Sequence, residues 1–262
     1  MNSWSRRRKR IILSILIFIV VVLIGVPMFL LFYRAPTCFD VRQNGDEAGV
    51  DCGGSCQLLC TSDSLPLILK GDPRVLTLAT STYQVVALVE NSNSTAEIPR
   101  AGYIIKVYDA SSAVPVKVFE GEVYVPRGDT SVVFDGPFVL EAGVVPVRAT
   151  LGWKEPTIVW NQNSLSSPEL RVVEPVFSRL ETSPRLEATV ENPTLGSVSN
   201  IDLTVLVSDT SGNIFAASRT FVDELRPGER NKVIFTWPRS FEQEPVGIEI
   251  LIRVLPDRSY IR

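Results

Sequence analysis

The chain has 262 residues, a formal net charge of −3 and no histidine. Because histidine is the commonest general base and a usual zinc ligand, its absence excludes Ser-His and Cys-His nucleophile pairs and histidine-bound zinc. Residues 1–34 hold six of the 26 basic side chains and none of the 29 acidic ones, so residues 35–262 carry a net charge of −9 and we expect no nucleic-acid partner.

Residues 11–33 carry no charged side chain and are mostly Ile, Leu, Val and Phe. At about 1.5 Å per residue the segment covers roughly 34 Å, more than the ~30 Å hydrocarbon core of a bilayer. The sequence therefore predicts one transmembrane helix, with the lipid bilayer as its partner. A cleaved secretory signal is the alternative, but the bulky Leu31, Phe32 and Tyr33 stand where a cleavage site needs small residues.

The charges that flank this helix predict its orientation. A basic run from Arg6 to Arg10 precedes the helix, whereas the single Arg34 follows it. Because basic residues stay on the cytoplasmic side, we expect residues 1–10 to be cytoplasmic. Everything after the helix should then lie outside the plasma membrane.

All four cysteines lie in residues 34–65, a segment that we call the collar: Cys38, Cys52, Cys56 and Cys60. An even number of cysteines outside the membrane predicts two disulfides, which can be connected in three ways. A zinc site with four thiolates is the alternative. The spacing C-x13-C-x3-C-x3-C lacks the paired C-x2-C of such sites and therefore disfavours it.

Oxygen-bearing side chains fill the loop between the first two cysteines. Asp40, Asn44, Asp46 and Asp51 are interleaved with glycines, and such a bent, oxygen-rich loop is what Ca²⁺ requires. These four residues are the candidate calcium ligands. A solvated acidic turn closed by a disulfide explains the same residues without a metal, and we prefer that interpretation. No other cofactor is predicted.

Residues 38–56 match the pattern C-x-D-x-x-x-N-G-D-E-x-G-x-D-C-G-G-x-C at every fixed position. The segment resembles a cysteine module that recurs in extracytoplasmic bacterial proteins. The resemblance implies a location outside the cytoplasm and says nothing about activity.

Beyond Cys60 short alternating apolar runs are separated by Gly, Pro, Asn, Asp and Ser, which predicts an all-β fold. The clearest strand covers residues 200–209. Its apolar face consists of Ile201, Leu203, Val205 and Val207. The alternate residues Asp202, Thr204 and Ser208 are predicted to face water.

The two halves of this region repeat at an offset of 100 or 101 residues. Val89-Glu90-Asn91 recurs as Val190-Glu191-Asn192, and Val132-Val133-Phe134 recurs as Val233-Ile234-Phe235. Repeated matches in one order predict a duplicated domain of immunoglobulin-like size. The expected parts are a sandwich over residues 66–160, a polar linker over 161–167, a second sandwich over 168–256 and a tail over 257–262.

In residues 190–235 a V-x-N motif precedes a strand that ends in x-x-D-x-x-G, and L-x-P-G-E and V-x-F follow it. This order resembles the FxLYD and CARDB group of bacterial immunoglobulin-like domains and the late-embryogenesis-abundant type-2 domain. The first copy departs from it, because Ser111-Ser112 replaces the turn glycine. The resemblance implies a binding or scaffolding module.

These observations predict a non-enzymatic, single-pass membrane protein that presents two immunoglobulin-like domains as a binding or scaffolding module of the cell envelope. Its partner would be an envelope or surface protein or a glycan. A calcium-dependent surface adhesin or envelope assembly subunit is the alternative. An extracytoplasmic hydrolase ranks third, because no catalytic residues converge in the sequence.

Overall fold

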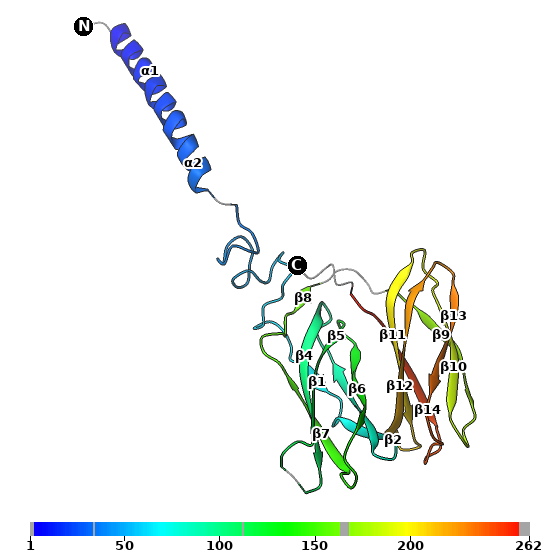
Figure 1. Ribbon diagram of the computed structural model, residues 1–262. Coiled ribbons are helices and arrows are strands. Elements are labelled where there is room, and N and C mark those ends of the chain that lie inside the picture. Colours follow the sequence, from blue (N-terminus) through cyan, green and yellow to red (C-terminus); the bar gives the residue numbers. More distant parts are fainter. Residues whose placement is uncertain (1–2, 34, 112, 163–167, 257–262) are drawn as a thin grey trace.

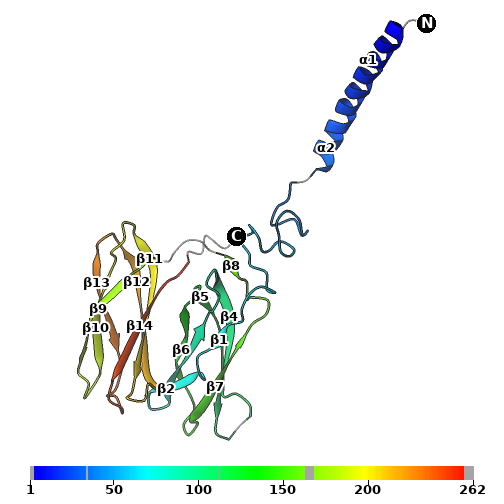
Figure 2. The ribbon, with the colours of Figure 1, turned by 180° about the vertical axis from the view of Figure 1, so that it is seen from behind.

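The computed structural model describes residues 3–33, 35–111, 113–162 and 168–256. A long N-terminal helix leads through the collar to two β-sandwiches that lie side by side in both views (Figures 1 and 2). All sheets are antiparallel. The predicted all-β class is therefore confirmed.

The N-terminal helix consists of α1 (Ser3–Val20), a π-helical segment (Val21–Gly25) and α2 (Val26–Phe32). Pro27 has no N–H to donate, and the π turn before it accommodates the missing bond. The apolar stretch Arg7–Phe32 is 26 residues long, and none of it is buried. By length and composition it is the one helix in the described chain that could cross a membrane.

The two sandwiches share one topology. In the first, one sheet contains β1 (Ile68–Leu69), β2 (Arg74–Ala79), β3 (Thr82–Glu90) and β6 (Thr130–Val139), and the other contains β4 (Ala96–Asp109), β5 (Lys117–Val125), β7 (Pro146–Trp153) and β8 (Asn161–Gln162). In the second, β9 (Arg171–Ser178), β10 (Arg185–Glu191) and β13 (Arg230–Thr236) form one sheet, and β11 (Val198–Ser208), β12 (Ile214–Leu225) and β14 (Gly247–Val254) form the other. The orders β2-β3-β6 and β5-β4-β7 recur as β9-β10-β13 and β12-β11-β14.

Each sandwich has its own core between its two sheets. Ile201, Leu203, Val205 and Val207 are fully buried in the second core, so their predicted shared face is confirmed. The equivalent strand β4 contributes Tyr103, Ile105 and Val107 to the first core.

The opposite face of β11 does not face water, contrary to the sequence prediction. Asp202 and Thr204 are buried, with 9% and 5% exposure, and Ser208 is half-buried. This face packs against the β2-β3-β6 sheet of the first sandwich. A third apolar cluster joins the two sandwiches there, and we call it the interface; its buried members are Leu76, Val86, Leu206, Ala217 and Leu251.

The register of β6 also corrects the predicted repeat. Val133 lies opposite Ala87 in the first core, and Val233 lies opposite Ala188 in the second. The structural offset along this strand is therefore 100 and not 101. A shift of one residue exchanges the two faces of a strand. The residues that the sequence matched, such as Phe134 and Phe235, therefore lie on opposite faces of their sheets.

The predicted linker begins inside a strand. Asn161 and Gln162 form β8, which pairs with Glu97 and Ala96 of β4. The rest of the predicted linker, 163–167, and the predicted tail, 257–262, lie outside the described residues.

Candidate functional site

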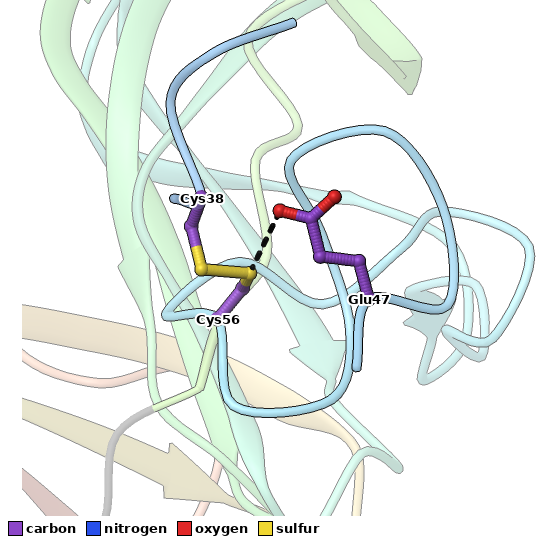
Figure 3. Close-up of side chains that lie close together, drawn as sticks. All are labelled: Cys38, Glu47 and Cys56. Atoms are coloured by element: carbon purple, nitrogen blue, oxygen red, sulfur yellow. Dashed lines mark hydrogen bonds between the residues drawn. A yellow bond between two sulfur atoms is a disulfide. The ribbon is translucent and has the colours of Figure 1, made fainter. Parts of the chain in front are cut away.

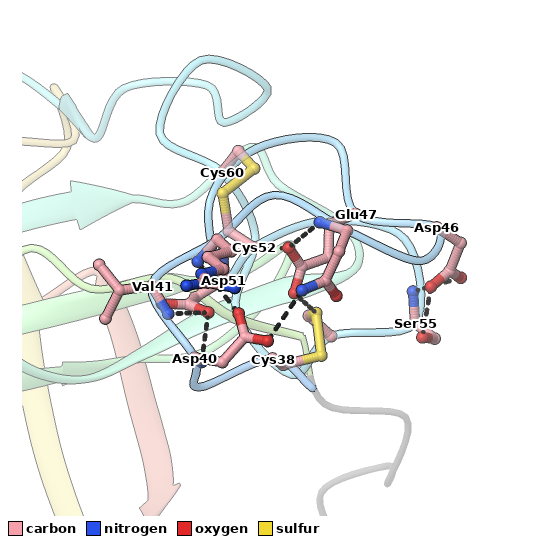
Figure 4. Close-up of a disulfide and its surroundings, with 12 residues drawn as sticks. Cys38, Asp40, Val41, Asp46, Glu47, Asp51, Cys52, Ser55 and Cys60 are labelled. Atoms are coloured by element: carbon pink, nitrogen blue, oxygen red, sulfur yellow. Dashed lines mark hydrogen bonds between the residues drawn. A yellow bond between two sulfur atoms is a disulfide. The ribbon is translucent and has the colours of Figure 1, made fainter. Parts of the chain in front are cut away.

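Two disulfides hold the collar together (Figure 4). Cys38 pairs with Cys56, and Cys52 pairs with Cys60, so the four cysteines are connected first to third and second to fourth. No thiol is free among the described residues. All four sulfurs are in disulfides in this structure, whereas a four-thiolate zinc site needs thiolates.

The candidate calcium ligands Asp40 and Asp51 accept hydrogen bonds from the collar backbone. Asp51 accepts the N–H of Asp40 at 3.0 Å and the N–H of Val41 at 3.1 and 3.0 Å. Asp40 accepts the N–H of Arg42 at 3.0 Å and the side-chain amide of Asn44 at 2.8 Å. These bonds fix the turn that follows the first cysteine.

The remaining candidate, Asp46, faces away from that turn. Its carboxylate accepts the backbone N–H of Ser55 at 3.0 Å and the Ser55 hydroxyl at 2.8 Å. The bond from the Ser55 hydroxyl holds the pKa of Asp46 below its ordinary value. Figure 4 shows Asp46 and Ser55 apart from Asp40 and Asp51.

Glu47 was not among the predicted ligands, yet it belongs to a group of three potential metal-ligating residues. Its Oε1 is 3.5 Å from Sγ of Cys56 (Figure 3), and among the described residues Cys38, Glu47 and Cys56 form the group of three whose ligand atoms lie within 4.8 Å of one another. A disulfide sulfur carries neither hydrogen nor negative charge, so the group offers a cation only one carboxylate.

The structure therefore brings Asp40, Asn44 and Asp51 together around one turn of the collar and leaves Asp46 apart from them. Their oxygens accept N–H or O–H groups, with the exception of Asn44 Oδ1, which is buried without a hydrogen-bond partner. A carboxylate that already accepts two or three donors loses those bonds when it turns toward a metal.

The collar is attached to the first sandwich through Asn93. The Asn93 side chain accepts the N–H of Leu65 at 2.7 Å and donates to the Leu65 carbonyl at 2.8 Å, as a neighbouring strand would. The N–H of Leu59 donates to the carbonyl of Trp160 at 2.9 Å, and the Trp160 ring is 3% exposed. Sequence reasoning missed this attachment; the signal was a second Asn two residues after the V-x-N motif.

A polar network lies beside the interface. Arg219 donates two hydrogen bonds to Asp202, at 2.7 and 2.8 Å, and Asp202 raises the pKa of Arg219. Gln84 of the first sandwich, 3% exposed, donates to the carbonyl of Ala217 in the second at 2.8 Å. Arg253 pairs with Asp129 at 3.1 Å across the same boundary.

Next to Arg219 are two residues of the first sandwich, the buried Tyr103 and the half-buried Asp135. Burial raises the pKa of both groups; the nearby Asp135 adds to the rise for Tyr103, and the nearby Tyr103 hydroxyl partly offsets the rise for Asp135. Asp135 Oδ2 is buried without a hydrogen-bond partner among the described residues.

A cavity of about 290 Å³ adjoins this network, and its walls include Tyr103, Asp202 and Arg219. The two carboxylates that line it, Asp202 and Glu122, are each bound by an arginine, Arg219 and Arg100. Both carboxylates are thus engaged in ion pairs with arginines.

Comparison with protein-family models finds no match, and no curated protein matches either. Among solved structures the chain is similar to a red sea bream transglutaminase, at 12% identity and a TM-score of 0.23, over 72% of this chain and 31% of that one. It is also similar to a β-glucuronidase from glycoside hydrolase family 2, at 12% identity and a TM-score of 0.24, over 85% of this chain and 28% of that one. The chain thus spans less than a third of either protein, and TM-scores this low carry no argument about function.

Proposed function

We propose that this protein is a non-enzymatic, single-pass membrane protein of the cell envelope. Its two sandwiches form one arm outside the membrane that binds or scaffolds an envelope or surface protein or a glycan. The FxLYD- and CARDB-like order of motifs in the second sandwich supports a binding role. The paired state of the carboxylates Asp202 and Glu122 in the interdomain cavity supports the absence of catalysis.

The observation that carries this proposal is the disulfide-closed collar between the apolar helix and the sandwiches. The helix ends at Phe32, and Pro36 already packs against Gly45, where an added Cβ would come within 3.3 Å of the Pro36 Cβ. Two disulfides then close the collar, and Asn93 attaches its end to the first sandwich. A bilayer-spanning helix would thus position the arm through a short rigid stem.

The interface extends this rigidity to the second sandwich. Apolar residues from both sandwiches are buried there together with Thr204 and with Gln84, which donates to the carbonyl of Ala217. An inter-domain contact that is largely apolar restrains domain motion. A rigid arm presents its outer surfaces in one geometry, which suits a scaffold.

Topology is tested on intact cells that produce the full chain with a C-terminal epitope. External protease should remove the epitope, and the chain should resist extraction from membranes by carbonate. A protected epitope, or release by carbonate, would contradict the proposed topology.

Binding is tested by placing a photo-crosslinker at single positions in the same cells. Crosslinkers at Thr189 or Lys106, on the outer faces of the two sandwiches, should give discrete adducts with another envelope component. The matched control is Val86, which is 2% exposed and should give none. An absence of adducts from both outer faces would contradict a binding role.

The calcium-dependent adhesin is the competing function. It would need Asp40, Asn44, Asp46 and Asp51 to reorganise, because Asp46 bonds to Ser55 and the Asp51 carboxylate bonds to backbone N–H groups. We expect millimolar calcium to leave the thermal unfolding of the full chain unchanged. A rise in melting temperature that Asp46→Ala abolishes would favour the adhesin.

A further inference from the structure

The turn at the start of the collar exposes two apolar side chains. Phe39 is 78% exposed and Val41 is 79% exposed, and they alternate with Asp40 on one short segment directly after Cys38. Single exposed apolar residues are common on proteins. Two on one locked turn, in a segment otherwise rich in acidic and polar residues, call for a physical explanation.

The backbone at Val41 is strained. Its φ is +59°, in the left-handed region that β-branched residues avoid. Such a conformation persists only where neighbouring groups impose it, and strain of this kind is concentrated at functional sites. The neighbouring group here is Asp51, whose carboxylate accepts the N–H groups of Asp40 and Val41.

Further bonds hold the turn from its other side. Cys38 is tied to Cys56 by a disulfide, and the Asp40 carboxylate accepts from Arg42 and Asn44. These bonds fix the backbone of residues 38–44 and leave the side chains of Phe39 and Val41 pointing outward. Figure 4 shows the Val41 side chain directed away from the rest of the collar.

The position of this turn along the chain identifies what lies next to it. Four Cα–Cα steps connect Phe32, the last residue of the helix, to Pro36, so they lie at most about 15 Å apart. The headgroup layer on each side of a bilayer is roughly 5–8 Å thick. If the helix spans the bilayer, the collar must therefore lie at the membrane surface.

We propose that Phe39 and Val41 form a membrane-contacting tip that inserts into the boundary between headgroups and acyl chains. This inference rests on the proposed function, since it requires the helix to span the bilayer. Aromatic and aliphatic side chains at that depth gain from leaving water. The tip would give the stem a second contact with the membrane and so limit its tilt.

Charge selects the lipid in which the contact is strongest. The collar carries Asp40, Asp46, Glu47 and Asp51 against Arg42 within residues 36–56. Anionic headgroups would repel this surface. Phosphatidylcholine vesicles, with and without bromine on the upper part of the acyl chains, are therefore the appropriate probe.

The test uses the full chain reconstituted in these vesicles. Phe39→Trp and Val41→Trp each add one fluorophore to the four native tryptophans, whose emission is subtracted using the unsubstituted protein. We expect the added emission to be shifted to the blue and quenched by bromolipid. The control is Val114→Trp, because Val114 is 70% exposed in the β4–β5 loop, far from the helix in Figure 1.

The outcomes separate the two proposals. Chains that float with the vesicles but show no more quenching for Phe39→Trp and Val41→Trp than for Val114→Trp overturn the membrane-contacting tip alone. Chains that fail to float with the vesicles overturn both the tip and the membrane anchor. Asp51→Asn provides a second check, because loss of the lock should reduce quenching in the Val41→Trp protein.

Discussion

One face of the repeated sandwich has opposite chemistry in its two copies. On β3 of the first copy the outward residues Val86 and Leu88 belong to the interface, and Val86 is 2% exposed. At the equivalent positions of β10 the second copy has Glu187 and Thr189, and Glu187 pairs with Arg185 and Lys232, both at 2.8 Å. The duplication preserved topology and core, while the outer faces diverged.

This difference explains how two sandwiches stack without continuing further. The first copy contributes its β2-β3-β6 sheet to the interface, whereas the second contributes β12-β11-β14, which is equivalent to the other sheet of the repeat. Such a heterologous contact leaves a free face at each end, and a matching apolar face could propagate the stack. On the β9-β10-β13 face the ion-paired Glu187 lies between the exposed apolar residues Val176 and Ile234, so this face is not a matching apolar surface.

The largest effect is expected from a charge inside a core that both copies preserve. Val205 is fully buried in the second core, so Val205→Asp should cost about 3–5 kcal/mol and abolish cooperative unfolding of the second sandwich. Hydrogen exchange measured by mass spectrometry on the full chain in detergent checks this for each sandwich separately. Normal protection of β10, β11 and β13 would show that the core face is wrongly assigned.

A smaller effect is expected from making the first copy resemble the second. Val86→Glu places an unpaired carboxylate in the interface and should separate the sandwiches, at about 2–4 kcal/mol, while each core stays protected. Hydrogen exchange should rise in the strands that carry the interface, β2, β3, β11, β12 and β14, and stay unchanged in β4 and β10. The matched control is Glu187→Val on the exposed equivalent face, which should leave the melting temperature nearly unchanged. Equal effects of the two substitutions would contradict the comparison.

The sequence revealed what depends on local patterns. Alternation identified Leu203 and Val205 as core, the even number of cysteines outside the membrane predicted two disulfides, and repeated motifs predicted the duplication. The sequence could not reveal the interface, because alternation shows that one face of a strand is polar but does not show whether another domain covers that face. Asp202 and Thr204 were assigned to water for this reason. The unbroken apolar run Val85–Val89 was the available signal, since a strand buried on both faces reads that way.

The candidate site was predictable in composition and not in geometry. The acidic residues of the collar were identified, but their hydrogen bonds depend on which cysteines pair, and spacing leaves three connectivities open. With Cys38 joined to Cys56, Asp51 lies beside the N–H groups of Asp40 and Val41. The carboxylates consequently bind backbone groups.

An intermediate effect is expected at the asparagine that the two copies share. Asn91 donates to the carbonyls of Ala96 and Pro126, and Asn192 donates to those of Gly196 and Leu225, all at 2.8–2.9 Å. Asn91→Ala and Asn192→Ala should each cost about 1–3 kcal/mol, because buried carbonyls lose their donor.

Only one of these two substitutions should reach the collar. Asn91 also accepts the N–H of Asn93, and Asn93 in turn binds Leu65 of the collar. In the second copy the equivalent N–H comes from Thr194, which does not bind the collar. Limited proteolysis should therefore cut the collar faster in Asn91→Ala than in Asn192→Ala. Identical collar cleavage in the two variants would contradict the attachment through Asn93.

The smallest effect concerns a position where the cores themselves differ. Asp135 pairs with Val85 in the register of β6, and the equivalent position opposite Leu186 is Phe235, which is 1% exposed. The first copy thus carries a carboxylate where the second carries a phenyl ring. The nearby Tyr103 hydroxyl and Arg219 of the docked second sandwich both lower the cost of its charge.

Burial nevertheless raises the pKa of Asp135, and the sign of the pH dependence follows. A raised pKa means that the folded state keeps its proton where the unfolded state has lost it. This group therefore lowers stability as pH rises from the unfolded value of about 3.9 through the folded pKa.

Asp135→Asn removes the charge, so the substitution should raise the melting temperature more at pH 7 than at pH 4. The control Asp209→Asn should do the reverse, because backbone N–H groups of Asn213 and Ser211 lower the pKa of Asp209 and its stabilisation is lost as pH falls. Thermal unfolding of the full chain between pH 3 and pH 8 measures both effects. If the melting temperatures of the two variants changed with pH in parallel, Asp135 would not be the buried carboxylate that distinguishes the first core from the second.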